Sequence, residues 1–334
     1  MNKIVSRRHF LTASCFDIVY LWEDELSRAL GIDIVDDERL TSKALSRMAK
    51  SRFWRMAALL FPSLANRLSF TSNALAFELD VWRDPGFNRP DIIPCIIDFQ
   101  ERNWLHLCCF ALAFRKCKVV LVSSKEACEF LKRRGVSLPV RHWALSIPDS
   151  LVSEERLRSG KRYDMAMMGR VNPVLDGYVR RYARTHPDFV YLSKAVKDGR
   201  VAYESSKGEF VGTADAYTDY LRIMGMAKIG VYCTPGMDGA RSDARGFNQV
   251  TPRFLEYLSS GCHVIARYPN NADVSYYDLP SICPSIESYD QFEREVDRMR
   301  RVPIDVERYL KYLARHVTST RAAELKAIMQ EEIL

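Results

Sequence analysis

The sequence predicts an α/β protein with two successive domains, each containing a mainly parallel β-sheet. The first observation is that short apolar runs alternate with helical patterns of 10 to 13 residues, which is typical of βαβ units. The second is a polar stretch without apolar periodicity, residues 149–162, that separates two such series. The third is the length of 334 residues, which is enough for two hydrophobic cores. We therefore expect an N-terminal domain over residues 1–150, a C-terminal domain over residues 151–315, and a final helix at 316–334 that returns to the first domain.

Each domain is expected to contain its own alternating set of elements. In the first domain the expected strands are 91–98, 118–124 and 140–145, and the expected helices are 103–115 and 125–134. In the second domain they are strands at 164–168, 189–192, 209–211, 228–233 and 262–266, helices at 175–185, 215–227 and 252–260, and helical segments through much of 288–332. Parallel sheets bind ligands at the carboxyl ends of their strands, so a ligand cleft is expected between the carboxyl ends of the two sheets.

The charge balance favours an anionic partner. The chain has 49 Lys and Arg against 42 Asp and Glu, which fits a nucleotide, a phospholipid surface or a nucleic acid. Residues 40–77 contain six Lys and Arg and no Asp or Glu, with aromatic residues among the cations. Residues 43–67 are therefore expected either to contact an anionic membrane surface or to form an amphipathic helix packed on the first domain. The absence of an RRM, KH or zinc signature argues against a nucleic acid.

Cysteine usage and the N-terminus predict a cytoplasmic protein, peripheral on the inner membrane face if residues 43–67 bind lipid. The nine cysteines show no CxxC pair and no metal-ligand spacing, so reduced, buried thiols are expected. Residues 6–11, SRRHFL, resemble a twin-arginine export signal, but charged residues follow in place of a long apolar region. No window holds the ~18 apolar residues that a membrane-spanning helix needs.

A phosphate-binding site is predicted where the helix at 252–260 begins. Thr251 is a good N-cap, and proline suits the first helical position because its missing N–H costs nothing there. The helix N-terminus can hold a phosphate, and Arg253 can add a bidentate contact. Glu256 lies one turn later on the same side and can accept hydrogen bonds from ribose hydroxyls. The alternative is an ordinary helix cap, with Arg253 and Glu256 as surface charges.

Three segments, DMAMMGR at 164–170, MAKIGV at 226–231 and TPRFLEYLSSGCHVI at 251–265, resemble in order and spacing the donor domain of GT-B fold glycosyltransferases. The resemblance is to the group-1-like set that includes CgeB-like proteins. It covers residues 160–315 well and the N-terminal half only by architecture. It implies two Rossmann-like domains that face each other across a cleft. It also implies a UDP- or GDP-sugar as co-substrate, with no other cofactor.

The resemblance also implies which residues bind the donor. By position, Gly169 and Arg170 in the loop after the first donor-domain strand would hold the diphosphate with Arg253, while Glu256 would bind the ribose. Lys228 would be a further cation on the diphosphate. Fixed cations and helix dipoles can stabilise a departing diphosphate without a metal ion. Arg170 as a solvated loop charge and Lys228 as an exposed strand flank are the structural alternatives.

One departure from the family pattern concerns stereochemistry. Retaining members usually carry an acid near the donor sugar, and the counterpart here is Asn248, in the sequence RGFN at 245–248. An amide can hydrogen-bond sugar hydroxyls but cannot act as an anionic nucleophile or base, so stereochemistry cannot be carried over. The polar stretch 237–245 could form a mobile lid in which Asp238, Arg241 and Asp243 contact the sugar, or a solvated loop.

A catalytic base, if the enzyme inverts, is expected from the first domain. Asp98, at the end of an apolar strand, is the first candidate, Glu101 is close enough to replace it, and Asp17 is a third. An acid that caps the next helix is the alternative for Asp98, and His142 is expected to pack inside the domain. No carboxylate or histidine cluster has metal-ligand spacing, so metal-independent chemistry is expected. GxGxxG and P-loop motifs are also absent.

The expected function is transfer of a sugar from a nucleotide donor to a lipid-linked glycan acceptor in surface polysaccharide or glycoconjugate synthesis. Two alternatives stay open at this stage. One is a non-catalytic subunit that binds nucleotide-sugars or glycans, which the absent loop acid makes conceivable. The other is a GT-B-like sugar-nucleotide epimerase, which would need no acceptor.

Overall fold

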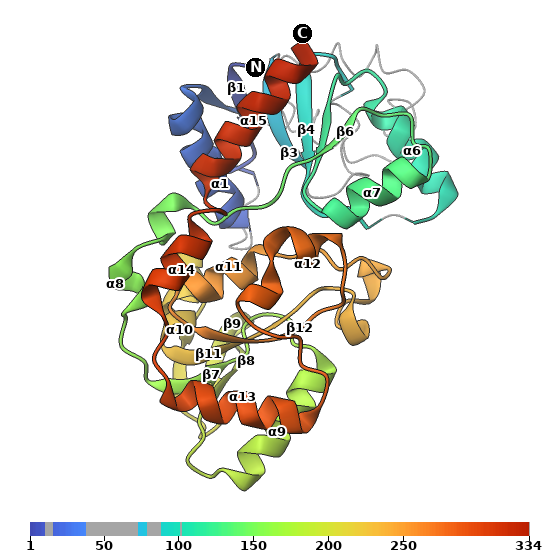
Figure 1. Ribbon diagram of the computed structural model, residues 1–334. Helices are drawn as coiled ribbons and strands as arrows, with labels where there is room; N and C mark the ends of the chain where they lie inside the picture. The colour runs from blue at the N-terminus through green and yellow to red at the C-terminus, as the bar shows by residue number, and fades with distance from the viewer. Residues whose placement is uncertain (11–15, 38–72, 79–87, 101, 334) are drawn as a thin grey trace. The chain divides into compact units, whose positions relative to one another are not determined.

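The computed structural model describes residues 1–10, 16–37, 73–78, 88–100 and 102–333 (Figure 1). The basic segment 43–67 and Glu101 lie outside the described residues. The chain divides into two compact units, which we call unit 1 (Met1–Leu145 and Thr318–Leu334) and unit 2 (Ser146–Val317). Both units are α/β, with six-stranded sheets dominated by parallel strand pairs, and this confirms the predicted fold class.

Unit 1 contains a fully parallel sheet in the described residues. Its strand order is β2 (Asp33–Asp36), β1 (Lys3–Ser6), β3 (Ala74–Glu78), β4 (Ile92–Ile96), β5 (Val120–Val122), β6 (Val140–His142). The interior strands β3 and β5 are buried along their whole length, as expected for parallel strands covered on both faces. The helices of this unit are α1 (Asp17–Leu30), α6 (Trp104–Phe114), α7 (Lys125–Arg133) and α15 (Thr318–Ile333).

The last helix, α15, packs along α1 in unit 1 (Figure 1). Nζ of Lys326 donates a hydrogen bond to the backbone oxygen of Ala29 at 3.3 Å. Nε1 of Trp143, just after β6, donates to the backbone oxygen of Arg321 at 2.9 Å. These contacts tie the two ends of the chain to the same sheet.

The sheet of unit 2 is parallel in its centre and antiparallel at one side. Its order is β10 (Phe210–Thr213), β9 (Arg200–Ser205), β8 (Tyr191–Lys197), β7 (Tyr163–Ala166), β11 (Ala227–Cys233), β12 (His263–Arg267). Strands β8, β9 and β10 form antiparallel pairs that the sequence analysis does not predict. The turn between β8 and β9 is Asp198-Gly199, whose φ angles of 52° and 74° suit a type I′ hairpin.

Helices cover both faces of the unit 2 sheet (Figure 1). On one face α9 (Pro173–Thr185) and α13 (Tyr289–Arg301) build a core with β7, β11 and β12. On the other face lie α10 (Tyr217–Gly225), α11 (Pro252–Ser259) and α14 (Val306–Leu313). The remaining helices are α8 (Glu154–Leu157), inside the stretch predicted as an irregular linker, and α12 (Ala272–Tyr277). Helices α9 and α11 begin after the carboxyl ends of strands, so their N-termini lie at the carboxyl edge of the sheet.

The described residues bear on two general expectations, which concern membrane-spanning helices and cysteines. Among the described residues, no helix combines the length and the apolar character that crossing a bilayer requires. The eight described cysteines are free thiols, six of them buried.

Candidate functional site

The loop after β7 is built around the side chain of Arg253. Gly169 has φ of +68°, a left-handed conformation that favours glycine. A Cβ atom at this position would lie 2.5 Å from Nη2 of Arg253. Nη1 of Arg253 donates to the backbone oxygen of Arg170 at 3.3 Å. The first turn of α11 and the loop 169–170 are therefore in direct contact.

Two tyrosine hydroxyls hold the backbone of this loop. The amide of Gly169 donates to the hydroxyl of Tyr203 at 3.2 Å, and the amide of Met168 donates to the hydroxyl of Tyr257 at 3.0 Å. Tyr257 in turn donates to the backbone oxygen of Ala166 at 3.1 Å. Its ring crosses β11 at Gly230, where a Cβ would lie 2.1 Å from the ring. Because these bonds pair the backbone groups that lead into the loop, its geometry is fixed before any ligand arrives.

The N-terminus of α11 carries no side-chain cap. Thr251 occupies the N-cap position in an extended conformation, but its side chain makes no capping hydrogen bond, and its amide donates to the hydroxyl of Tyr232 at 3.0 Å. Asn172, in contrast, caps α9 by accepting from two first-turn amides. Residue 252 is a proline, and the amide of Phe254 donates to the backbone oxygen of Thr251 at 3.2 Å. What an anion can use at the start of α11 is therefore the amide of Arg253 and the partial positive charge of the helix.

An acid and a cation lie within this first stretch of α11. Glu256 is 5% exposed, and its carboxylate accepts a hydrogen bond from the hydroxyl of Tyr217 at 2.8 Å. Burial raises the pKa of Glu256, while the Tyr217 hydrogen bond and the charge of Arg253 act in the opposite direction. Arg253 is partly buried, and its Nε has no hydrogen-bond partner among the described residues. Burial works to lower the pKa of Arg253, but Tyr220, Tyr257 and Glu256 outweigh it and raise the pKa.

The arrangement suits a ligand with a phosphate and hydroxyl groups. Arg253 and the uncapped helix start supply positive charge and donors, and the exposed Arg170 lies beside them. Glu256 supplies acceptor oxygens one turn away. Of the residues predicted to bind the donor, the structure brings Gly169, Arg170, Thr251, Arg253 and Glu256 together at one edge of the sheet.

Lys228 lies away from this group. It is near the amino end of β11, whereas the loop 169–170 and the start of α11 follow carboxyl ends of strands. Five residues of strand, about 16 Å, separate Lys228 from Cys233 at the carboxyl end. Its Nζ donates to the backbone oxygen of Arg300 at 3.4 Å. The structure therefore gives Lys228 no contact with the other predicted ligands, because a parallel strand presents its two ends at opposite edges.

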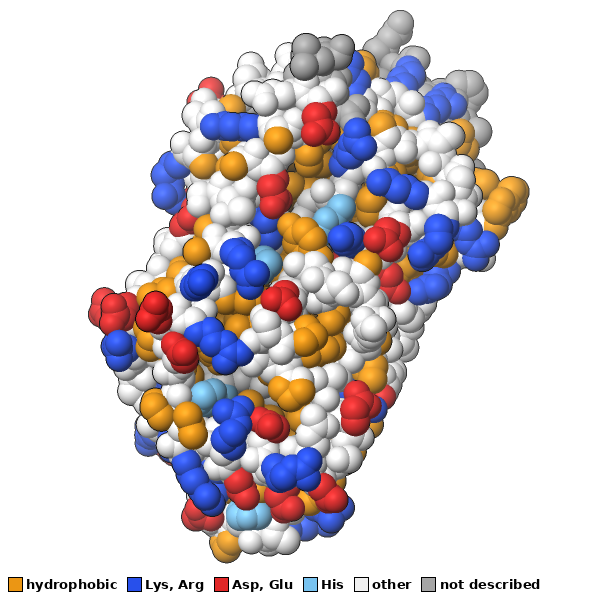
Figure 2. All heavy atoms as spheres, in the orientation of Figure 1, with side chains coloured by type: hydrophobic (Ala, Val, Ile, Leu, Met, Phe, Trp, Pro, Cys, Tyr) orange, Lys and Arg blue, Asp and Glu red, His pale blue; other side chains and the backbone are white. Residues whose placement is uncertain are grey.

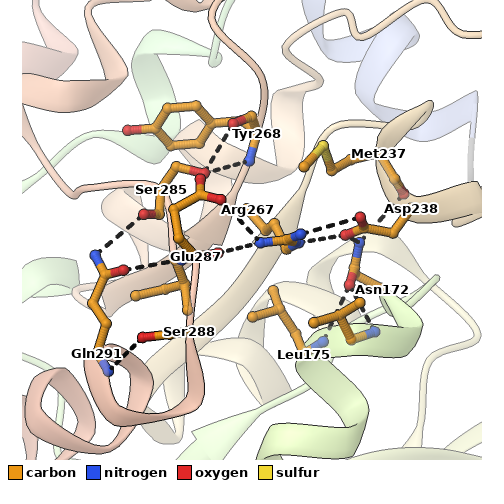
Figure 3. Close-up of polar contacts among 12 residues, drawn as sticks. Asn172, Leu175, Met237, Asp238, Arg267, Tyr268, Ser285, Glu287, Ser288 and Gln291 are labelled. Carbon is orange, nitrogen blue, oxygen red and sulfur yellow. Dashed lines mark hydrogen bonds and ion pairs between the residues drawn. The ribbon is translucent and has the colours of Figure 1, made fainter.

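The polar loop 234–250 is anchored at Asp238 (Figure 3). The Asp238 carboxylate accepts two hydrogen bonds from the Arg267 guanidinium, one of them at 3.2 Å, and one from Nδ2 of Asn172 at 2.8 Å. Both Arg267 and Asn172 come from regular elements or their caps. Asp238 is thus committed to holding the loop, and the expectation that it contacts a sugar from a mobile lid is not supported by this geometry.

Asn248 also belongs to the internal bonding of this loop. Its Oδ1 accepts from the hydroxyl of Thr234 at 2.7 Å, and its Nδ2 donates to the backbone oxygen of Gly246 at 3.2 Å. Its own backbone oxygen accepts from Nδ2 of Asn271 at 3.1 Å. The residue joins the two ends of the loop, a role that explains an amide at this position without reference to a donor sugar.

The carboxyl edge of the unit 1 sheet carries a second group of charged residues. Arg7 forms ion pairs with Asp37 at 3.2 Å and Glu78 at 2.9 Å, and both carboxylates are buried. Arg8 pairs with Glu23 at 3.1 Å, and Glu23 also accepts from Oγ of Ser6 at 2.5 Å. The two arginines that resemble an export signal are therefore part of the folded edge of this sheet.

A histidine and an aspartate at this edge are absent from the predicted site. His9 follows β1, and its Nδ1 lies 2.8 Å from Oδ1 of Asp36, at the end of the neighbouring strand β2. The His9 side chain is 67% exposed, so its ring is accessible from solvent. The sequence separates the two residues by 27 positions. The sequence signal for this pair is a short apolar strand near the N-terminus that is followed by Arg-Arg-His. The strands predicted from the sequence begin only at residue 91.

The three residues predicted as candidate bases are Asp98, Glu101 and Asp17. Asp98 follows β4 and accepts a hydrogen bond from Nε2 of Gln100 at 2.6 Å. It is half-buried at the carboxyl edge of unit 1. Glu101 is outside the described residues, and Asp17 begins α1. In the described ranges, no group of three or more His, Cys, Asp or Glu side chains is arranged to hold a metal ion.

Comparisons with known proteins support the fold. No protein-family model and no curated protein sequence matches the chain. The N-terminal domain of Candida albicans trehalose-6-phosphate phosphatase is similar in structure, with a TM-score of 0.50 and 8% identity over 84% of this chain and 74% of that one. The glycotransferase of kitacinnamycin aligns with a TM-score of 0.42 and 13% identity over 97% of both chains. The first likeness extends over both α/β units and concerns the fold alone, and the second is too distant to carry an argument.

Proposed function

We propose that the chain is a glycosyltransferase that moves a sugar from a nucleotide-sugar donor to a glycan acceptor. The supporting observation is the contact between Gly169 and Arg253, which joins a glycine loop to the uncapped start of α11. The loop follows β7, and α11 begins after β11. Both therefore lie at the carboxyl edge of the parallel strands, where ligands of such folds bind. The proposed acceptor is lipid-linked, and the proposed pathway makes a surface polysaccharide or glycoconjugate.

In this proposal the donor diphosphate binds at the start of α11. The backbone amide and the guanidinium of Arg253 bind its oxygens, and the exposed Arg170 adds a second cation. When the bond between the sugar and the diphosphate breaks, negative charge grows on the leaving oxygens. Fixed donors and cations in a partly desolvated site stabilise that charge without reorganising. Lys228 has no part in this step because it lies at the other end of β11.

Glu256 is proposed to accept hydrogen bonds from the ribose. Tyr217 donates to Oε1 of the carboxylate and so fixes its orientation. The position one helical turn after Pro252 matches the distance between a diphosphate and its ribose. A UDP- or GDP-sugar has this arrangement, as do other nucleoside diphosphate sugars, so the base is left to experiment.

For an inverting reaction we assign the base to His9. When Nδ1–H of His9 donates a hydrogen bond to Oδ1 of Asp36, Nε2 carries a lone pair that can take the proton of an acceptor hydroxyl. The acceptor oxygen then bonds to the anomeric carbon, the bond to the diphosphate breaks, and the proton remains on His9. Asp98 is the alternative base at the same edge of unit 1.

Nucleotide binding is the first test. Isothermal calorimetry with UDP, GDP, ADP, CMP and dTDP, without added metal, should find one tight ligand. Glu256→Gln and Glu256→Ala should weaken it about tenfold or more, which corresponds to roughly 1.4 kcal/mol. The matched control is Lys228→Ala, which should bind like the wild type. If no nucleotide binds, or if Lys228→Ala weakens binding as much as Glu256→Ala, the proposed site is wrong.

Turnover then separates the possible activities. A transferase consumes the nucleotide-sugar only when the acceptor is present, apart from slow hydrolysis. An epimerase would change the donor without an acceptor, and a binding subunit would leave the donor intact under both conditions. Thin-layer or mass-spectrometric analysis of the sugar after incubation with and without a lipid-linked oligosaccharide makes this distinction.

A further inference from the structure

Helix α6 in unit 1 exposes an apolar face. Its eleven residues, WLHLCCFALAF, include no Asp, Glu, Lys or Arg. The inner side is buried, through Leu107, Phe110 and Phe114. On the outer side Trp104 is 75% exposed, Leu105 59% and Leu112 38%. A helix that is apolar all round is normally covered on all sides, so this outer face is suited to a contact outside the unit.

Basic side chains lie at both ends of this apolar face. At its start, the guanidinium groups of Arg102 and Arg134 lie 5.5 Å and 5.3 Å from the ring of Phe130, which places the basic end of α7 beside the start of α6. At its end, the exposed cations are Arg115, Lys116 and Lys118. Figure 2 shows hydrophobic side chains projecting at the side of unit 1 where α6 lies, with Lys and Arg side chains near them.

We propose that the outer face of α6, defined by Trp104, Leu105 and Leu112, docks on an anionic lipid surface. Trp and Leu can enter the boundary between headgroups and acyl chains, and the flanking Lys and Arg can reach the headgroup charge with their long side chains. Tryptophan favours this interface because its ring is apolar and its N–H is polar. The helix is about 16 Å long, far less than the ~30 Å of a hydrocarbon core, so it lies along the surface rather than across it.

The character of the rim favours lipid over a protein partner. Protein interfaces combine an apolar centre with a rim that supplies both signs of charge and about one hydrogen bond per 100–200 Å². Five exposed Lys and Arg lie at the two ends of α6, and Glu126 pairs with one of them, Arg102, at 3.7 Å. A bilayer with anionic lipids offers continuous negative charge and needs no matching hydrogen bonds.

This inference goes beyond the proposed reaction and does not depend on the nucleotide. Docking through α6 would bring unit 1 to the surface that holds a lipid-linked acceptor. Nucleotide binding is measured without vesicles, and the proposed nucleotide site lies in unit 2, so failure of one proposal leaves the other intact.

Vesicle flotation with the full-length protein tests the docking. The probes are vesicles of phosphatidylcholine alone and vesicles that also contain about a third of phosphatidylglycerol. We expect binding to the anionic vesicles, weakened about tenfold by the double variant Trp104→Ser, Leu105→Ser, and weakened by Arg115→Glu with Lys116→Glu. Val196→Ser is the matched control, since Val196 is 73% exposed on β8 of unit 2. Melting curves and calorimetry with the nucleotide establish that the variants are folded.

Fluorescence separates direct contact from an indirect effect. Brominated lipids in the anionic vesicles should quench part of the wild-type tryptophan fluorescence, and Trp104→Phe should remove that part while vesicle binding persists. Three outcomes would overturn the proposal: no binding to anionic vesicles, equal binding by the Trp104 and Leu105 double variant, or loss of a dimer in that variant during gel filtration. The last result would assign the face to a second copy of the chain.

Discussion

The guanidinium of Arg253 packs against the backbone of Gly169, so closely that a Cβ at residue 169 would lie 2.5 Å from Nη2. Arg253 belongs to the first turn of α11, and Gly169 follows β7, 84 residues earlier. The contact leaves room for no side chain at 169, and it directs the arginine toward the glycine loop. A phosphate at the start of α11 would therefore meet the loop and the arginine as one preassembled surface.

This contact predicts the effect of Gly169→Ala. The substitution forces a Cβ into the Arg253 guanidinium and also into a left-handed φ of +68°. We expect a loss of about 1–3 kcal/mol in the free energy of unfolding and a marked loss of nucleotide affinity, because Arg253 must move. Urea unfolding and calorimetry measure the two effects separately.

Gly199→Ala is the control for backbone strain. Gly199 has φ of +74°, but a Cβ there has no atom within 4 Å. Gly199→Ala should lower the free energy of unfolding by about 1–2 kcal/mol through backbone strain alone, and it should leave nucleotide affinity unchanged. If both variants bind nucleotide equally well, the contact between residues 169 and 253 has no role in the site.

Local signals in the sequence were enough to predict the start of α11. A Thr-Pro-Arg step, a glycine loop after a strand and a glycine after the helix each constrain the backbone where they occur, and the structure has Pro252–Ser259 as a helix followed by β12. The side-chain environment was not predictable in this way. That Glu256 would be buried against Tyr217, and Arg253 laid against Gly169, depends on partners 39 and 84 positions away.

At the carboxyl edge of the unit 1 sheet, the contacts again depend on residues that are distant in the sequence. His9 and Asp36 come together only because β1 and β2 are neighbours in a parallel sheet, and neither strand was assigned in the sequence analysis. Asp238 looked like a solvated loop residue because its partner Arg267 lies beyond the next helix. The β8–β9 hairpin, in contrast, carried a local signal in Asp198-Gly199 that could have been used.

The anchored loop gives a second prediction. Asp238→Ala removes the carboxylate that Arg267 and Asn172 share, and it leaves a largely buried guanidinium without this partner. We expect a loss of about 1–3 kcal/mol in unfolding free energy and faster trypsin cleavage after Arg241 and Arg245 in the loop. Limited proteolysis followed by mass spectrometry identifies the cleavage sites.

Glu154→Ala serves as the control for a removed ion pair. Glu154 pairs with Arg158 across one exposed turn of α8, and such pairs contribute only a few tenths of a kcal/mol. The unfolding free energy and the trypsin cleavage pattern of Glu154→Ala should match those of the wild type. Equal proteolysis of Asp238→Ala and wild type would show that Asp238 does not restrain the loop.

Glu23 predicts how the stability of unit 1 depends on pH. Burial raises its pKa from 4.5 to about 7, against the opposing effects of Ser6 and Arg8. The folded carboxyl therefore keeps its proton up to about pH 7, whereas the unfolded one releases it near pH 4.5. The stability that this group contributes is fully present below pH 4.5 and is lost as the pH rises through about 7, by up to about 3 kcal/mol.

The variant Glu23→Gln measures this contribution, because glutamine resembles the protonated acid and does not titrate. Relative to the wild type, its unfolding free energy should rise between pH 5 and pH 8, by up to about 3 kcal/mol. Urea unfolding of both proteins at several pH values gives the difference. A constant difference across the range would mean that Glu23 is ionised in the folded protein throughout.

His9 and Asp36 give the last prediction, which concerns the proposed transfer reaction. His9→Gln removes the base, and kcat should fall about 100-fold to 10,000-fold. The Kd for the nucleotide should stay unchanged, because the proposed diphosphate site lies wholly in unit 2. Asp36→Asn acts through the imidazole, so it should lower kcat with little change in KM, and Asp36→Glu should restore part of the rate.

Asp98→Asn decides between the two candidate bases. Asp98 follows β4, which is two strands from β1 in the same sheet, and lies at the same carboxyl edge. It is half-buried, and its carboxylate accepts a hydrogen bond from Gln100. If His9 is the base, Asp98→Asn should retain most of the turnover, because its carboxylate then takes no proton. Full turnover in His9→Gln together with loss in Asp98→Asn would transfer the role to Asp98. In that case the hydrogen bond between His9 and Asp36 would serve only to join the ends of β1 and β2.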